Sequence, residues 1–408
     1  MSGLPVSTPI AVFTIHEDTG RVVVTWPDGE KMPIGTREAL RKGRERTDDI
    51  LETFRRGVPG LVPKLAQVES ALRELLAATD QLVRLLVGDD AGLRVRIEKR
   101  LAKYRDAHKR EAGGIPFVEV HGHADFFPFE LLPLFGPKEV PSLGNRAEAE
   151  DVLARCLGYG VAVRRVRGEQ VVSAPLRAGD GGVPMQFLRY RMPGAATEGS
   201  FFDGCEGRLV VEGPWPPDKL DRASVASKLL DSLHNPRRRL DGADSLPVPI
   251  QIQHFACHCD TQFDDADDYA LILGRDAGHR VTLKEIYDGV LEREREALWD
   301  EGRPLVMLNA CGSTRISAKD FRSFPTWFLS NRYRAFLGAE TDVPDIVAAH
   351  YAARLYEELL GGAALAEAVV RARRRLWNER GNPLGLLYVM YGDPFLTLEP
   401  KKEESSHV

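Results

Sequence analysis

The chain has 408 residues and a formal net charge of −5, and 43% of its residues are hydrophobic, 28% charged and 8% aromatic. A chain of this length can form two or three domains, and the composition is typical of a soluble globular protein. The acidic balance argues against binding of nucleic acid through a broadly basic surface. No stretch approaches the roughly 18 apolar residues that cross a membrane, and the N-terminus lacks a signal-peptide pattern, so we expect a cytoplasmic protein without membrane partners.

The cysteines do not indicate a disulfide framework. The chain has five cysteines, an odd number. They are far apart in a long chain that we expect to lie in a reducing compartment. Each cysteine is therefore interpreted as a buried thiol, a metal ligand or a nucleophile. The five are Cys156, Cys205, Cys257, Cys259 and Cys311.

Residues 1–35 predict a β-hairpin region. Apolar and polar residues alternate over 11–15 and again over 22–26, and the turn sequence Asp-Thr-Gly at 18–20 separates the two runs. The pattern predicts two antiparallel strands joined by a short turn.

Residues 36–112 predict a helical region. Their apolar residues recur mostly at three- and four-residue steps, with breaks at 59–60 and 88–90, which indicates about three helices. We interpret the region as a helical layer that packs on a later sheet. A separate module that binds a partner is the alternative.

Residues 113–207 begin with a short strand at 117–120 and become rich in loops from residue 138. Residues 208–400 then alternate between buried strands and helices. Strands are predicted at 208–211, 249–257, 304–309, 335–338 and 386–390, and helices at 223–233, 283–299, 326–332, 346–360 and 364–377. This alternation predicts an α/β fold with a mostly parallel sheet covered by helices on both faces. Residues 401–408 are polar and predict a disordered tail.

Reactive side chains follow two of the predicted strands. The strand at 249–257 runs into His258, and the strand at 304–309 is followed by Cys311. Since functional groups gather at the carboxyl ends of parallel strands, we expect the histidine and the cysteine to meet at one edge of the sheet.

That pair is suited to nucleophilic catalysis. A free thiol has a pKa of about 8.5 and is only a few per cent thiolate at neutral pH, so a neighbouring base is needed to activate it. His258 can accept the thiol proton and later donate it to a leaving amine. Gly312 permits a sharp turn directly after Cys311. The backbone N–H of Cys311, together with one near His258, can form an oxyanion hole.

The residues around this pair resemble those of the CHAT-domain proteases, relatives of caspases and separase in clan CD. The two central motifs are His-Phe-Ala-Cys-His at 254–258 and Leu-Asn-Ala-Cys-Gly at 308–312. Further similar segments lie at 128–132, 269–274, 336–339, 343–345, 356–361 and 391–394, so that the resemblance covers about residues 115–398. The spacing of about 50 residues between histidine and cysteine also fits caspases.

The resemblance implies a caspase-like fold and a cysteine endopeptidase that cleaves a protein through a thioester, without metal or organic cofactor. It implies His258 and Cys311 as catalytic residues, with backbone groups of Cys259, Cys311 and Gly312 in the oxyanion hole. It also implies a role in bacterial antiviral defence or regulated cell death, with a protein substrate, such as a gasdermin-like one, and an activating protein partner. The chain departs from the family at Cys259, where a glycine is usual, so a catalytically silent scaffold that binds a partner is the alternative.

The substrate pocket is less defined. We assign Ala256, Asn309 and Asp260 to it because they lie next to the two catalytic positions. Asn309 is neutral, so strong selectivity for Arg or Lys is not indicated. The acidic run at 260–268 is interpreted as a solvated loop, with recognition of a basic residue or of a cation as alternatives.

Several of these residues have other interpretations. Cys311 alone would read as a buried structural thiol. A metal site is an alternative interpretation of His254, Cys257, Cys259 and His258. The alternation of side chains along a strand, however, points Cys257 away from both histidines. The His-Gly-His sequence at 121–123 would supply another base, and we interpret it as turn histidines. Arginine runs at 237–239 and 371–375 are interpreted as solvated faces rather than a nucleic-acid site.

Overall fold

The computed structural model describes residues 8–16, 18–88, 90–111, 114–122, 127–136, 139–167, 174–241, 246–261, 265–275, 278–293, 303–315 and 323–399. The predicted tail at 401–408 lies outside these residues.

The strands alternate with helices through the second half of the chain. The strands are β1 Ala11–His16, β2 Arg21–Thr25, β3 Lys31–Thr36, β4 Phe117–His121, β5 Ala162–Val166, β6 Val183–Arg189, β7 Leu209–Trp215, β8 Ile252–Ala256, β9 His258–Asp260, β10 Ala270–Ile272, β11 Arg280–Thr282, β12 Arg303–Asn309, β13 Tyr333–Ala339 and β14 Tyr388–Gly392. The helices are α1 Arg37–Gly57, α2 Leu65–Val87, α3 Ala91–Glu111, α4 Arg146–Leu153, α5 Leu157–Gly160, α6 Pro193–Asp203, α7 Arg222–His234, α8 Leu283–Arg293, α9 Phe324–Ser330, α10 Asp345–Leu360 and α11 Leu365–Arg380. Short 3-10 helices lie at Phe129–Leu131, Ala266–Asp268 and Pro383–Leu387.

The centre of the fold is an 11-stranded sheet in the order β3-β2-β1-β4-β5-β14-β13-β12-β8-β6-β7. The strands from β13 to β7 in this order pair in parallel, and so do β14, β5, β4 and β1. The two parallel blocks meet antiparallel at β13 and β14. The predicted mostly parallel α/β sheet is therefore confirmed, and the N-terminal hairpin extends it through the pairing of β1 with β4.

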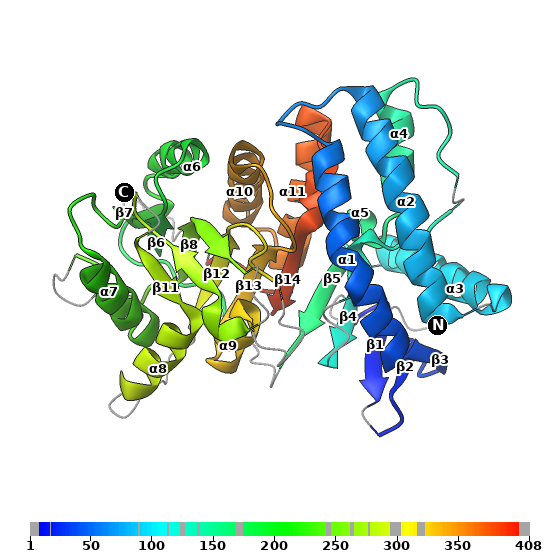
Figure 1. The fold of residues 1–408 in the computed structure, drawn as a ribbon, viewed down its shortest axis with the longest axis horizontal. Coiled ribbons are helices and arrows are strands. Elements are labelled where there is room, and N and C mark those ends of the chain that lie inside the picture. Colours follow the sequence, from blue (N-terminus) through cyan, green and yellow to red (C-terminus); the bar gives the residue numbers. More distant parts are fainter. Residues whose placement is uncertain are drawn as a thin grey trace, which may run out of the picture.

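Helices cover both faces of the sheet (Figure 1). Side chains of β12 alternate between two cores: Leu305 and Met307 belong to the core shared with α10 and α11, whereas Val306 and Leu308 belong to the core shared with α7 and α9. Leu51 of α1 packs in the first of these cores, so the N-terminal helices share it with the sheet. No helix in the described part of the chain is long and apolar enough to cross a membrane.

Some elements differ from the prediction. Helices α4 and α6 lie in the stretch that was expected to be mostly loop. Strands β9, β10 and β11 form a separate antiparallel sheet, so His258 lies in a strand rather than in a loop. Strands of three residues carry too little alternation for a sequence pattern to indicate them.

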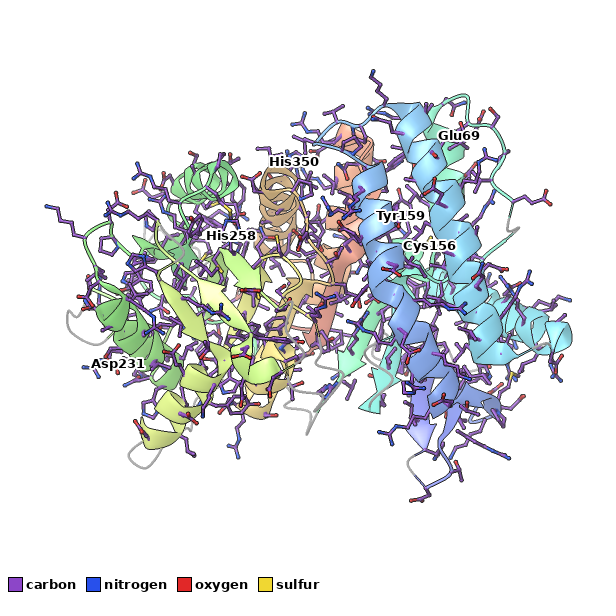
Figure 2. The ribbon with its side chains drawn as sticks, viewed as in Figure 1. Glu69, Cys156, Tyr159, Asp231, His258 and His350 are labelled. Carbon is purple, nitrogen blue, oxygen red and sulfur yellow. The ribbon has the colours of Figure 1, made fainter. Side chains whose placement is uncertain are left out.

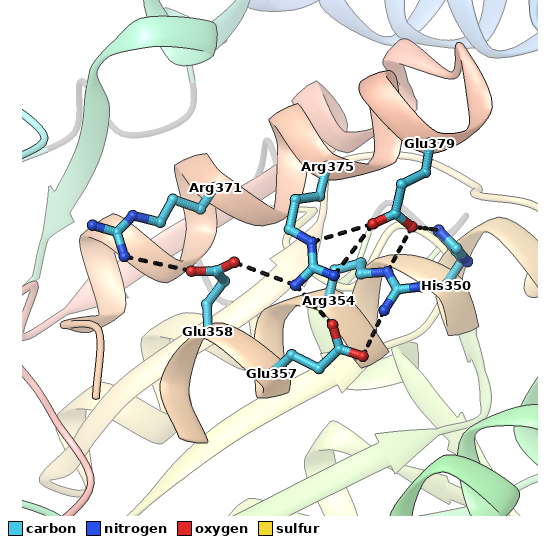
Figure 3. A network of polar contacts seen from close by, with 7 residues as sticks. All are labelled: His350, Arg354, Glu357, Glu358, Arg371, Arg375 and Glu379. Carbon is cyan, nitrogen blue, oxygen red and sulfur yellow. Dashed lines mark hydrogen bonds and ion pairs between the residues drawn. The ribbon is translucent and has the colours of Figure 1, made fainter. Parts of the chain in front are cut away.

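The arginine run at 371–375 is built into the fold. Its outer members join a network of ion pairs between α10 and α11 (Figure 3), formed by His350, Arg354, Glu357, Glu358, Arg371, Arg375 and Glu379. Arg373 is buried, against the expectation of a solvated face, and donates to the carbonyl of Tyr388 at 2.5 Å. In the other run, Arg239 pairs with Asp241 at 3.0 Å.

Candidate functional site

The two predicted catalytic residues follow neighbouring strands at matching positions. β8 and β12 pair in parallel, and Asn309 lies opposite Ala256 in their register. Cys311 comes two residues after Asn309, and His258 comes two residues after Ala256. Both residues therefore lie at the same edge of the sheet, where β8 and β12 end. Figure 2 labels the side chain of His258.

A tight turn follows β12 and carries Cys311. Gly312 has φ = +57°, in the left-handed region that favours glycine. A β-carbon at this position would lie 2.9 Å from Oγ1 of Thr261, whose hydroxyl donates to the Gly312 carbonyl at 3.3 Å. The turn therefore requires a glycine, and Thr261 ties it to the segment that follows His258.

Ser313 fixes the turn to the sheet, a role that sequence reasoning missed. Its buried hydroxyl donates to the carbonyl of Leu308 at 2.9 Å and accepts from the N–H of Ala339 at 2.9 Å. Gly338 leaves room for this contact, since a β-carbon there would lie 2.5 Å from the Ser313 oxygen. The hydroxyl thus joins β12 to β13 beside Cys311. A serine after a glycine gives no signal for such a bridge, because its partner lies on another strand.

Cys311 is partly exposed, whereas the other four cysteines are buried. The pKa of its thiol is raised to about 12, mainly because burial disfavours the thiolate and also because of the negative charge of Asp342. The backbone N–H of Val343 and the guanidinium of Arg55 act in the opposite direction. In this conformation, the thiol is protonated at neutral pH.

His258 is exposed, and its ring lies against that of Tyr190 with 4.5 Å between the ring centroids. Among the contacts of the described residues, no hydrogen bond joins His258 to Cys311. Catalytic hydrogen bonds are often long or poorly aligned before substrate binds, so this geometry does not remove the histidine as the base.

The backbone near Cys311 has donors for an oxyanion. Within the described part of the chain, the N–H groups of Cys311 and Gly312 have no hydrogen-bond acceptor. Cys259 lies in β9 opposite Leu271, and Arg332 is the one non-glycine residue with positive φ among those described. Cys259 therefore has a backbone conformation open to any residue, and its β-carbon causes no strain where the family usually has glycine.

The three predicted pocket residues have different environments. The side chains of Ala256 and Asn309 are buried, and Asn309 is hydrogen-bonded inside the protein. Neither side chain faces solvent in this conformation, so their assignment to the substrate pocket stays a prediction. Asp260 is partly exposed and pairs with Arg280 at 3.3 Å.

The four residues considered as a metal site do not converge. His254 is hydrogen-bonded on one face of the sheet, while Cys257 packs in the core on the other face. Cys259 packs in that same core, whereas His258 is exposed. Side chains alternate along the strand, so Cys257 lies on the opposite face from His254, as the sequence pattern predicted.

His121 lies elsewhere in the fold. His121 ends β4, which runs opposite to β12 and is separated from it by β5, β14 and β13. Its Nε2 contacts Glu119 at 2.7 Å. His121 therefore lies at the opposite edge of the sheet from Cys311, and His123 lies outside the described residues.

Helix α1 approaches the site, which the sequence did not indicate. Asp48 pairs with Arg315 at 2.7 Å, and the N–H of Arg315 donates to Gly312 at 2.9 Å. Arg55 of the same helix contributes positive charge at Cys311. These residues are more than 250 positions apart in the chain, so no local pattern relates them.

Comparisons with known proteins relate the C-terminal part of the chain to a domain family. The CHAT domain model matches residues 221–399, and no curated protein sequence matches the chain. In the separase–securin complex of Saccharomyces cerevisiae, a chain is similar at 11% identity with a TM-score of 0.47, over 95% of this chain and 30% of that one. The Arg-specific cysteine proteinase gingipain R, whose complex of pro- and mature domains from Porphyromonas gingivalis also matches, is similar at 10% identity with a TM-score of 0.43, over 76% and 68%.

This chain thus spans less than a third of the separase chain to which it is similar. The matched residues 221–399 include both central motifs and both strand ends of the candidate site. Residues 221–399 of this chain are therefore similar to the CHAT domain family.

Proposed function

We propose that this protein is a cysteine endopeptidase with Cys311 as nucleophile and His258 as general base. The observation that carries the proposal is the placement of the two residues at matching positions after the adjacent parallel strands β8 and β12. Residues of these two types at one sheet edge suit acyl transfer from a peptide.

Acylation begins when His258 accepts the thiol proton of Cys311. The sulfur attacks the carbonyl carbon of the peptide bond, and the negative charge that develops on the oxygen is held by the N–H groups of Cys311 and Gly312. Removing one such donor typically costs about 2.7–4 kcal/mol of transition-state stabilisation. The C–N bond then breaks, His258 donates its proton to the leaving amine, and a thioester remains on Cys311.

Hydrolysis returns the enzyme to its starting state. His258 accepts a proton from a water molecule, whose oxygen attacks the thioester carbonyl. The C–S bond breaks, and the proton on His258 returns to the sulfur of Cys311, so that the acid product leaves. This sequence uses only groups of the chain and water.

The conformation described here precedes activation. The thiol pKa of about 12 means that deprotonation of Cys311 is unfavourable until the imidazole of His258 reaches the sulfur. We propose that substrate or a protein partner induces this step in the cytoplasm. From family resemblance, we place the activity in bacterial defence or regulated cell death, with a gasdermin-like protein as one candidate substrate.

Labelling with peptides that carry an electrophilic carbonyl group tests the proposal. Wild-type protein should be labelled at Cys311, and His258→Ala should be labelled far more slowly. Cys156→Ala is the matched control, because Cys156 is buried away from the site. Equal labelling of wild type and Cys311→Ala would refute the proposal.

A catalytically silent scaffold is the second candidate function. It is favoured by the missing hydrogen bond between His258 and Cys311 and by the raised thiol pKa. Such a protein would bind a partner through the helical region at 36–112. It would resist all peptide electrophiles even when that partner is bound, and this outcome separates it from a gated protease.

A further inference from the structure

Five buried side chains from five elements form one hydrogen-bonded network on the sheet face covered by α6 and α10. They are Glu198 of α6, His254 of β8, Asn309 of β12, Tyr356 of α10 and Tyr388 of β14. The charged and polar members Glu198, His254 and Asn309 are 2%, 0% and 3% exposed. Polar groups are rarely buried so completely unless their hydrogen bonds are formed, and here they are.

The network has two branches that both end on Glu198. In one, the Tyr388 hydroxyl donates to Oδ1 of Asn309 at 2.6 Å, and Nδ2 of Asn309 donates to Oε1 of Glu198 at 2.7 Å. In the other, Nδ1 of His254 lies 3.0 Å from the Tyr356 hydroxyl, while Nε2 contacts Oε2 of Glu198. Both carboxylate oxygens of Glu198 are thus engaged.

The proton donors in the network follow from this pattern. A carboxylate only accepts, so Asn309 must turn its amide nitrogen towards Glu198, and its oxygen is left for Tyr388. In the same way, His254 presents an N–H to Glu198, and its other nitrogen can accept from Tyr356. Every donor in both branches points towards the carboxylate, which makes Glu198 the common acceptor of the network.

The network joins the two strands that carry the candidate dyad. Asn309 precedes Cys311 by two residues, and His254 precedes His258 by four. Because β12 and β8 are neighbours, one carboxylate from α6 reaches a side chain on each.

Helix α6 itself is anchored beside the site. The carboxylate of Asp345 accepts from the N–H of Gly194 at 2.9 Å, which joins the start of α6 to the start of α10. A β-carbon on Gly194 would lie 2.4 Å from the carbonyl oxygen of Asp345, so the two helix starts are in close contact. Asp342, whose charge acts on Cys311, precedes α10 by three residues. The position of Glu198 is therefore coupled to the segment next to the thiol.

We propose that Glu198 is a positioning residue of the candidate site. Through Asn309 and His254 it holds the ends of β12 and β8 in a fixed relative position, so that Cys311 and His258 can meet when the site is activated. This inference rests on the proposed function, because it assigns Glu198 a role in that same dyad.

An exchange of groups between Glu198 and Asn309 tests the inference. Asn309→Asp places two buried carboxylates in contact, which can share a proton at acid pH but repel at higher pH. In the double variant Asn309→Asp/Glu198→Gln the amide and carboxylate change places. The new amide donates to the carboxylate at 309, and its oxygen accepts from His254, so every hydrogen bond of the network is retained.

The readout is the second-order rate constant for labelling of Cys311 by a peptide that carries an electrophilic carbonyl group, which occupies the substrate site. The rate is followed by peptide mapping from pH 6 to pH 9, below the melting temperature of each variant. The rate of Asn309→Asp relative to wild type should fall about tenfold or more as the pH rises, because a small displacement of a reacting group can cost up to about 100-fold in rate. The double variant should stay within about threefold of wild type at every pH. The inference would be overturned if the ratio of the Asn309→Asp rate to the wild-type rate did not change with pH. It would also be overturned if the double variant lost as much rate with rising pH as Asn309→Asp does.

Two further variants help to interpret the labelling rates of the exchange experiment. Tyr388→Phe removes the donor to Asn309, while its ring keeps the stacking on Tyr351 at 3.8 Å, so it serves if Asn309→Asp does not fold. It should lower the rate of labelling by the peptide electrophile about threefold, and a wild-type rate would count against the inference. His258→Ala separates the two ideas. If the peptide electrophile labels this variant like wild type, the proposed dyad fails; if it labels this variant slowly but labels the network variants like wild type, only the role of Glu198 fails.

Discussion

The ring of His258 lies against the ring of Tyr190, with 4.5 Å between centroids and 54° between planes. Aromatic contacts of this kind contribute about 0.5–1.5 kcal/mol beyond the buried area. Since His258 is otherwise exposed, the contact limits the orientations of this proposed general base. We predict that Tyr190→Ala lowers kcat/KM for peptide cleavage about threefold to tenfold, and that Tyr190→Phe keeps it near wild type. An equal loss in both variants would assign the effect to the hydroxyl instead of the ring.

The charge of Asp342 opposes formation of the thiolate. Burial and then Asp342 raise the pKa of Cys311 to about 12. Asp342→Asn should therefore lower the thiol pKa and increase alkylation by iodoacetamide at pH 7–9 about threefold or more, because a larger fraction of the sulfur is then thiolate. In wild type the rate should still be rising with pH at pH 9, below the thiol pKa.

Arg55 provides the control with the opposite sign. Its guanidinium lowers the pKa of Cys311, so Arg55→Gln should raise that pKa and slow alkylation over the same pH range. A change in the same direction for Asp342→Asn and Arg55→Gln would mean that the two residues act through packing around the thiol rather than through charge.

Position 312 requires a glycine for two separate reasons. Its φ of +57° costs about 1 kcal/mol or more for a residue with a β-carbon, and that carbon would meet Thr261 at 2.9 Å. We predict that Gly312→Ala abolishes labelling of Cys311 by peptide electrophiles and lowers the melting temperature.

Gly60 is the matched control for this substitution. It has φ = +68°, and a β-carbon there would meet nothing within 4 Å. Gly60→Ala should therefore show the backbone cost alone and keep the labelling of Cys311. Comparable labelling of the two alanine variants would show that the turn after Cys311 tolerates displacement.

The sequence indicated the parts of the site that depend on local pattern. The strands before Cys311 and His258 are recognisable from their apolar runs, and Gly312 from its place after the nucleophile. The carboxyl ends of parallel strands lie at one edge of the sheet because the strands run in the same direction. The common edge of Cys311 and His258 could therefore also be predicted.

The remaining features depend on contacts between distant segments. Asn309 was assigned to the pocket because it is near Cys311 in the chain, yet its partners Glu198 and Tyr388 come from other elements and hold it in the core. Glu198 lies in α6, a helix with little amphipathic pattern in a stretch that reads as loop. Burial of a polar side chain is decided by its partners, and these were not visible in the sequence.

Arg165 should be among the most important residues for stability. It lies between Glu130 and Glu340 at 2.6 and 2.8 Å, and all three side chains are at most 3% exposed. Removing one member of a buried ion group typically costs about 3–5 kcal/mol, because the remaining charge is left without compensation. We predict that Arg165→Met lowers the free energy of unfolding by about this amount at pH 7, measured by urea denaturation.

The loss should become smaller at acid pH. Burial raises the pKa of Glu340 and Arg165 lowers it, so removing the arginine leaves a carboxyl that is more readily protonated in the folded state. When the pKa of a carboxyl is higher in the folded than in the unfolded state, its protonation stabilises the fold. This contribution is fully present at pH values below the unfolded pKa and is lost as the pH rises through the folded pKa. The difference between wild type and Arg165→Met should therefore narrow from pH 7 towards pH 4.5.

Arg371 offers an exposed comparison for this substitution. Its side chain is 45% exposed and contacts Glu358 at 3.5 Å and Glu367 at 3.4 Å. Exposed ion pairs contribute at most about 1 kcal/mol, so Arg371→Met should change the unfolding free energy by about 0.5 kcal/mol or less at either pH. Similar losses for the two methionine variants would mean that Arg165 contributes as an apolar side chain rather than as the cation between two buried carboxylates.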